Sequence, residues 1–165
     1  MPASNVPMAA IRRCAADREF LAAMESLYDE LDEAVAAHAP VCVTCGDCCR
    51  FQAAGHRLFV TSAELAYFLA HTQGAIRTAD AKQPCPHQAS GRCTTRRQRP
   101  VGCRVFFCDP AAQPWQGPLT EQTLDRLRDI HRRFAVPYAY VEWTAALNAS
   151  ASSRHGGCIP DKPIR

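Results

Sequence analysis

Residues 42–50 read CVTCGDCCR, a Cys-x2-Cys-x2-Cys-Cys motif that places four thiols within eight residues. Two residues between cysteines let one tight turn direct both sulfurs at one centre, which is why this spacing recurs in zinc and iron–sulfur sites. Gly46 suits such a turn because glycine adopts positive φ without strain. In an extended segment the adjacent Cys48 and Cys49 would point to opposite sides. They could therefore serve two different metal centres, or one could be a ligand and the other a packed thiol.

Four further cysteines follow between residues 85 and 108, in the segments CPH, GRC and RPVGCRVFFC. The eight thiols match two four-cysteine sites, or one such site with four thiols left for other work. This density favours metal binding over reduced buried thiols or incidental disulfides. His56 and His87 lie near the thiols in sequence, and either could replace a cysteine as ligand. The predicted metal ligands are Cys42, Cys45, Cys48, Cys49, Cys85, Cys93, Cys103 and Cys108.

The spacing narrows the choice of metal only in part. Zinc favours closed four-thiolate sites, iron–sulfur clusters use the same ligands, and sulfur donors also suit Cu(I). Three thiols at double x2 spacing are similar to the ferredoxin pattern, in which a more distant cysteine completes one cluster. The predicted cofactor is therefore an iron–sulfur cluster of the 4Fe–4S type, or zinc. On the ferredoxin analogy, Cys49 joins the remaining downstream thiols.

Charge is consistent with this prediction. The chain has 19 Lys and Arg against 16 Asp and Glu, a formal charge of +3, which is too small to argue for nucleic-acid binding. Two divalent ions held by eight thiolates would take the charge to about −1. Nearby arginines are expected to offset the anionic sites through N–H···S contacts, namely Arg50, Arg92, Arg96, Arg97, Arg99 and Arg104.

These motifs resemble the CxxCxxCC, or YkgJ-like, family of zinc- or iron-chelating domains. The resemblance covers about residues 40–110: the motif at 42–50, the helix start at 61–65, the segments around Cys85 and Cys93, and RPxxCRxFxC at 99–108. It implies a small cysteine-rich domain that binds zinc or iron, including iron as an iron–sulfur cluster, in proteins that mostly lack a defined reaction. One branch resembles the much longer flagellin lysine N-methylases. Thr94 and Thr95 stand where the family commonly has an apolar residue and an aromatic one.

Helices are predicted on both sides of the cysteines. Residues 17–38 carry apolar side chains at steps of three and four, and residues 61–64 have the capping-box form that opens a helix to about residue 71. Further helices are predicted for 120–134, with Thr120 as N-cap, and for 138–147. Residues 57–60 read as a short extended segment. Residues 79–118 hold six of the twelve prolines and are predicted to be loops held by metal.

The predicted fold class is mainly α: a small, cysteine-rich, metal-stabilised domain with a loop-rich centre flanked by helices. Within this single domain, residues 1–40 form an N-terminal helical segment, 41–110 the metal-binding region, 111–149 C-terminal helices packing on it, and 150–165 a flexible tail. Two of the ten cysteines lie outside the constellation. Cys14 is predicted to be a packed thiol and Cys158 a free one.

The chain has no apolar run of the kind a signal peptide or a membrane span needs, so we expect a cytoplasmic protein with no membrane contact. A reducing compartment favours metal ligands over disulfides. The motifs GxGxxG, HExxH, GxSxG and the P-loop do not occur, and no catalytic residue is assigned. The sequence predicts a metal-binding protein with a structural, redox or accessory role. The alternatives are a cluster- or metal-dependent enzyme that modifies a protein or small molecule, and a carrier that passes iron, zinc or copper to a protein partner.

Overall fold

The computed structural model describes residues 6–43, 45–72, 77–80 and 82–152, and these are mainly helical, as predicted. Within those ranges none of the helices combines the length and the apolar character that crossing a membrane would require. The predicted tail from residue 153 onward, with Cys158, lies outside the described residues. The α-helices in the described ranges are α1 (Met8–Ala15), α2 (Arg18–Ala37), α3 (Ser62–His71), α4 (Val101–Val105), α5 (Gln113–Arg133) and α6 (Trp143–Ser152).

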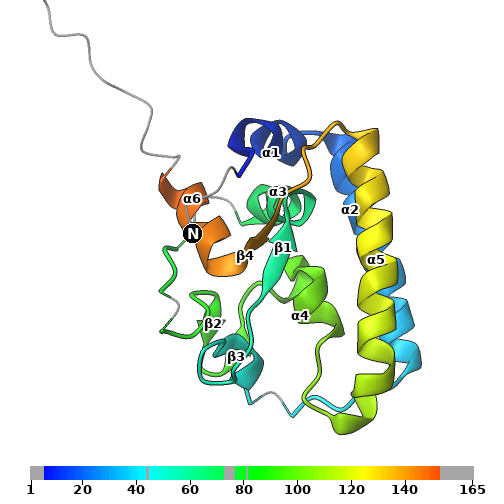
Figure 1. The fold of residues 1–165 in the computed structure, drawn as a ribbon, viewed down its shortest axis with the longest axis vertical. Helices are drawn as coiled ribbons and strands as arrows, with labels where there is room; N and C mark the ends of the chain where they lie inside the picture. The colour runs from blue at the N-terminus through cyan, green and yellow to red at the C-terminus, as the bar shows by residue number, and fades with distance from the viewer. Residues whose placement is uncertain (1–5, 44, 73–76, 81, 153–165) are drawn as a thin grey trace, which may run out of the picture.

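Two small antiparallel sheets and three 3-10 turns complete the described fold (Figure 1). Strand β1 (Phe59–Thr61) pairs with β4 (Tyr140–Glu142), and β2 (Gln88–Ala89) pairs with β3 (Arg92–Cys93) as a hairpin. The turns are η1 (Asp47–Cys49), η2 (Arg96–Gln98) and η3 (Pro110–Ala112). In Figure 1, α2 and α5 run side by side along one side of the molecule, whereas the β2–β3 hairpin lies at its lower end. The β2–β3 hairpin thus lies away from the long helices, whereas α4, which carries Cys103, packs on both of them.

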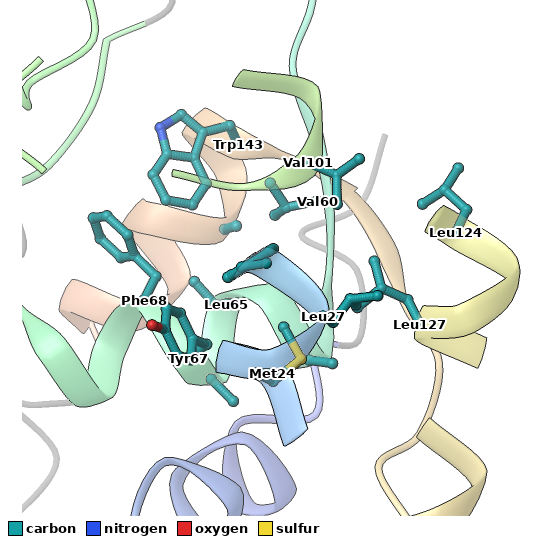
Figure 2. Packing of buried hydrophobic residues seen from close by; sticks show 14 of the residues in the cluster. Met24, Leu27, Val60, Leu65, Tyr67, Phe68, Val101, Leu124, Leu127 and Trp143 are labelled. Carbon is teal, nitrogen blue, oxygen red and sulfur yellow. The ribbon is translucent and has the colours of Figure 1, made fainter. Parts of the chain in front are cut away.

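Helix α2 forms as predicted because its sequence carries both a start signal and an apolar stripe. The carboxylate of Asp17 accepts hydrogen bonds from the backbone N–H groups of Glu19 and Phe20, at 2.9 and 3.1 Å. The apolar stripe is buried along its length, at Phe20, Met24, Leu27, Leu31 and Val35. Figure 2 shows Met24 and Leu27 among the buried side chains of α3, α4 and α5. Burial of each such side chain contributes about 1.5–3 kcal/mol. The core that the helices form is made largely without the predicted metal ligands.

The predicted capping box at the start of α3 is confirmed, and Glu64 also bonds a second helix. The Thr61 hydroxyl accepts from the Glu64 N–H at 3.2 Å, and the Glu64 carboxylate accepts from the Thr61 N–H at 2.6 Å. The second carboxylate oxygen of Glu64 accepts from the Val101 N–H at 2.8 Å, at the first residue of α4. Burial raises the pKa of Glu64, while these hydrogen bonds lower it. Glu64 therefore fastens α4 to α3.

The prediction of a helix over residues 138–147 is wrong in its first half. Residues 140–142 form β4 instead, and α6 begins at Trp143 and continues to Ser152. Tyr and Val favour a strand where a partner is available, and β1 supplies one across about 80 residues of sequence. The start of the predicted flexible tail is also wrong, because residues 150–152 belong to α6 and the side chain of Ser150 is buried.

The prediction that residues 79–118 are loops is also wrong in part, since β2, β3, α4 and the start of α5 lie there. Helix α5 begins at Gln113, so Thr120 is not its N-cap; the Thr120 hydroxyl donates to the carbonyl of Gln116 instead, at 2.7 Å. Pro114 fits the first turn, where backbone N–H groups have no helical partner. Pro118 lies inside the helix, where its ring removes one further hydrogen bond. The predicted end near Phe134 is confirmed.

A buried histidine joins α5 to α3 and makes stability depend on pH. His131 Nδ1 donates to the Val136 carbonyl at 2.9 Å, and Nε2 accepts from the Ala63 N–H at 3.4 Å, so the ring is held neutral. Burial lowers the pKa of His131 below its ordinary value of 6.5. The unfolded chain therefore binds a proton at a higher pH than the folded chain does. Stability from this group is present above about pH 6.5 and is lost as the pH falls toward the lower folded pKa.

We expect His131→Gln to reduce the loss of unfolding free energy between pH 7 and pH 5, compared with the unmodified chain. Urea unfolding at both pH values measures this difference. Protonation of the thiols contributes equally to both proteins and cancels in the comparison. His71→Gln is the matched control, because it replaces an exposed histidine at the end of α3 instead of the buried one. Equal pH dependence for His131→Gln and the unmodified chain would refute the assignment.

Candidate metal centre

The Cys-x2-Cys-x2-Cys-Cys motif forms a tight turn at Gly46, as predicted. Gly46 has a φ of 78°, a conformation that L side chains rarely adopt, and η1 follows directly. A Cβ atom at Gly46 would lie 2.6 Å from the Gly91 carbonyl oxygen, so the position needs glycine for space as well. The segment at Cys48 and Cys49 is a 3-10 turn rather than an extended strand, and the two thiols share a hydrogen bond. The segment is therefore not extended, and whether the two thiols serve different metal centres remains a prediction.

The β2–β3 hairpin packs on this turn and brings two more cysteines to it. The Cys85 N–H donates to the Cys49 carbonyl at 2.7 Å, and Gln88 Nε2 donates to the Gly46 carbonyl at 2.8 Å. Gln88 is in turn the strand partner of Cys93. The hairpin thus sets Cys85 beside Cys49, and it holds Cys93 on the strand opposite Gln88, which is bonded to Gly46.

Cys103 lies on α4, and two arginines hold this helix in place. Arg104 is buried and donates to Asp32 at 2.6 Å and to the Arg99 carbonyl at 2.7 Å, and its guanidinium lies 4.0 Å from the centre of the Tyr28 ring. The expectation that Arg104 offsets metal charge by N–H···S contacts is wrong, since these contacts tie α4 to α2.

Arg99 comes nearest to the charge-balancing role that the sequence predicts. It donates to the Cys103 carbonyl at 3.1 Å, and its charge acts on the thiols of Cys48 and Cys103. Burial lowers the pKa of Arg99, and Cys103 and Cys93 partly restore it. The remaining arginines predicted for this role have exposed side chains: Arg50, Arg92, Arg96 and Arg97.

His56 links the segment before Cys108 to η1. Its ring stacks on Phe106, with ring centres 5.3 Å apart, and its Nε2 donates to the Cys48 carbonyl at 3.2 Å. Phe51 contacts the same ring edge-on. This aromatic cluster holds the chain two residues before Cys108 against the turn that carries Cys48. His56 therefore has structural contacts of its own, to Phe106 and to the Cys48 carbonyl, and its alternative role as a metal ligand remains a prediction.

The nine cysteines in the described ranges are all free thiols, and the eight predicted ligands divide evenly by exposure. Cys14 is buried in the helical core, which confirms the prediction that it is a packed thiol. The half-buried ligands are Cys49, Cys85, Cys93 and Cys103. The exposed ligands are Cys42, Cys45, Cys48 and Cys108.

Electrostatic interactions among the thiols follow nearly the same division. Burial raises the pKa of Cys103, and the neighbouring thiols of Cys85 and Cys93 add to the rise, followed by Cys48. Burial also raises the pKa of Cys108, and there Cys45 contributes, followed by Cys48, Asp47 and Cys42. Cys48 belongs to the exposed set but interacts with both, because it lies next to Cys49.

The vicinal pair has the most strongly perturbed thiols. The hydrogen bond from Cys49 lowers the pKa of Cys48 to about 6, with Arg99 and His56 acting in the same direction. The same hydrogen bond raises the pKa of Cys49 well above its usual range, and burial raises it further. Within this pair, Cys48 is therefore the more readily ionised thiol and Cys49 the one that donates to it. The thiolate form of cysteine is the species that binds metal.

Cys85 receives two N–H groups that no sequence motif indicates. Burial raises the pKa of Cys85, whereas hydrogen bonds from the His87 backbone N–H and the Trp143 indole N–H lower it. Indole N–H groups only donate, so this sulfur is an acceptor in the fold. Such N–H···S contacts stabilise a thiolate and tune the metal it binds. Trp143 lies 58 residues beyond Cys85, and only the fold brings them together.

His87 is the remaining histidine near the thiols, and its ring is buried. It packs edge-on against Phe68, burial lowers its pKa, and its Nε2 has no hydrogen-bond partner. Such an atom is unusual in a folded protein, since nearly all buried polar atoms are paired. Its alternative role as a metal ligand remains a prediction.

The donor set fits a metal by its chemistry, but the sulfurs are not drawn together around one point. Across the ranges that the structure describes, no three His, Cys, Asp or Glu side chains are arranged closely enough to hold a metal ion. The same segments supply eight free thiols, two N–H donors to sulfur and the Arg99 charge. Metal binding would therefore require the loops to tighten. No family model, curated protein or solved structure matches the chain.

Proposed function

We propose that the chain is a metal-binding protein in which eight central cysteines hold an iron–sulfur cluster or zinc, with a structural, redox or accessory role. The observation that carries the proposal is the convergence of four separate segments, at residues 42–49, 85–93, 103 and 108, on one set of interacting free thiols. Each of these thiols, separated by up to 66 residues, makes its neighbours harder to ionise, and a shared metal cation would remove that cost.

Metal binding also accounts for the sequence of the loops that carry the thiols. Segments 45–58 and 82–100 contain few buried apolar residues, so they bury too little surface to balance the entropy of ordering them. Bound metal supplies that free energy in small cysteine-rich regions. The resemblance to the CxxCxxCC family, the cytoplasmic location and a protein partner remain predictions that accord with this proposal.

A carrier function is a second candidate, favoured by the exposure of Cys42, Cys45, Cys48 and Cys108. A metal held by exposed thiols can be reached by an acceptor. Two surface pockets lie away from the eight predicted ligands and give no separate support to the enzyme alternative. One, of about 650 Å³, lies between α2 and α5, and the other, of about 240 Å³, is lined by α1, α3 and α6.

Anaerobic purification of the full chain, followed by metal analysis, sulfide analysis and visible absorption spectroscopy, tests the proposal. We expect stoichiometric metal: iron with sulfide and visible absorption for a cluster, or zinc in a colourless protein. Cys158→Ser is the matched control, since Cys158 lies outside the constellation and should leave the metal content unchanged. A protein free of every metal, with the eight central cysteines oxidised in fixed pairs, would contradict metal binding.

A further inference from the structure

We infer, building on the proposed metal binding, that the eight thiols form two separate centres that differ in how readily they release metal. The inner centre comprises Cys49, Cys85, Cys93 and Cys103, and it retains its metal. The outer centre comprises Cys42, Cys45, Cys48 and Cys108, and it exchanges its metal with a thiol-bearing or chelating acceptor in solution.

Backbone geometry defines the inner centre. The Cys85 N–H is bonded to the Cys49 carbonyl at 2.7 Å, and the hairpin register places Cys93 opposite Gln88, which is itself bonded to Gly46. The carbonyl of Cys103 accepts from Arg99 at 3.1 Å. All four sulfur-bearing residues are half-buried. These bonds hold Cys85 beside Cys49 and fix the hairpin that carries Cys93, and metal binding would tighten the loops further to bring the four sulfurs to one ion.

The residues of the outer centre are held in place by other contacts than those of the inner centre. Its four residues are exposed, and two of them, Cys42 and Cys45, precede the turn at Gly46. The stack of His56 on Phe106, together with the bond from His56 to the Cys48 carbonyl, is the contact that holds Cys108 near Cys48. This contact leaves the outer thiols facing solvent, where an acceptor can approach a bound metal.

Charge and hydrogen bonding favour retention at the inner centre. Two N–H groups donate to the sulfur of Cys85, and the Arg99 guanidinium acts on Cys93 and Cys103. At the outer centre Arg99 reaches Cys48, but Asp47 adds a negative charge beside Cys108. Removing hydrogen-bond partners of metal ligands typically weakens binding by about 10–100-fold. We therefore expect release from the outer centre to be about 10-fold faster or more.

Zinc release from the full chain tests the inference. The chain is loaded anaerobically with Zn²⁺, desalted and mixed with an excess of a colorimetric zinc chelator. The metal passes to the chelator, and the freed thiolates take up protons from water. We expect two equivalents of zinc per chain, one released in a fast phase and one in a slow phase.

Three variants show which centre releases its zinc in the fast phase and which in the slow phase. Cys108→Ser should remove the fast equivalent and leave the slow one, and Cys93→Ser should do the reverse. Trp143→Phe should accelerate the slow phase by about 10-fold and leave the fast phase unchanged, because it removes one N–H donor to Cys85 but keeps an aromatic ring. Cys158→Ser should release both equivalents as the unmodified chain does.

The possible failures are distinguishable from one another. A single equivalent per chain, or two equivalents lost in one phase that either Cys108→Ser or Cys93→Ser abolishes entirely, would overturn the division into two centres while metal binding stands. A chain that retains no zinc and was purified without metal would overturn the proposed function itself.

Discussion

Removing the metal is expected to lower the melting temperature by about 10 °C or more and to expose the amides of residues 45–58 and 82–108 to hydrogen exchange. Structural zinc binding contributes roughly 10–16 kcal/mol in zinc-finger peptides. Even about 3 kcal/mol of this would shift the melting temperature of a chain this long by roughly 10 °C. Differential scanning calorimetry and hydrogen exchange on loaded and chelator-treated full chain measure both effects.

The helical core provides the internal control for this experiment. Helices α2, α3 and α5 bury their apolar faces on one another, so their amides should remain protected after metal removal. Adding the metal back should restore both the melting temperature and protection of the two loop segments. Identical exchange in loaded and stripped protein would show that the loops are ordered without metal.

Glu64→Ala is expected to lower the free energy of unfolding by about 2–5 kcal/mol. The substitution leaves the N–H groups of Thr61 and Val101 without their acceptor, and each buried unsatisfied donor costs about 1–3 kcal/mol. Because Val101 begins α4, which carries Cys103, the variant should also release metal faster than the unmodified chain. Urea unfolding of the loaded protein and the chelator assay measure these effects.

Glu33→Ala is the matched control for Glu64→Ala, since Glu33 is an exposed glutamate on α2. Exposed substitutions of this kind usually change stability by less than about 0.5 kcal/mol. Glu64→Gln keeps the size of the side chain and one carbonyl oxygen, so it should fall between the two. A Glu64→Ala variant as stable as Glu33→Ala would show that the link between α3 and α4 is dispensable.

Local signals in the sequence are sufficient to predict the elements that depend on neighbouring residues alone. The box of Thr61 and Glu64 lies within three residues of the groups it bonds, and the apolar repeat over residues 17–38 lies within one helix; both predictions are confirmed. The start of α5 was predicted wrongly because Pro114 and Pro118 resemble loop residues, although the first turn of a helix accepts proline. Strand β4 was missed because its partner is distant in sequence.

The candidate site shows the same contrast between local signals, which can be read from the sequence, and contacts between distant segments, which cannot. Cysteine spacing identifies the thiols, and Gly46 identifies the turn, because both are properties of a short segment. The bond from Glu64 to Val101 spans 37 residues, and the indole of Trp143 meets a sulfur 58 positions earlier. The division of the thiols by exposure likewise follows from how the hairpin packs on η1. These features arise from tertiary packing, for which a single sequence carries no signal.

The pairing of β1 with β4 also determines when the site can close during synthesis. Trp143 follows β4 directly, and its backbone N–H is bonded to the Leu58 carbonyl at 2.8 Å. All eight thiols leave the ribosome before this residue does, and at about 5–20 residues per second the interval is a few seconds. During that interval the nascent loops lack the last N–H donor to Cys85. On the proposed metal binding, an ion delivered while the chain is still being made would meet the eight thiols before Trp143 can donate to Cys85.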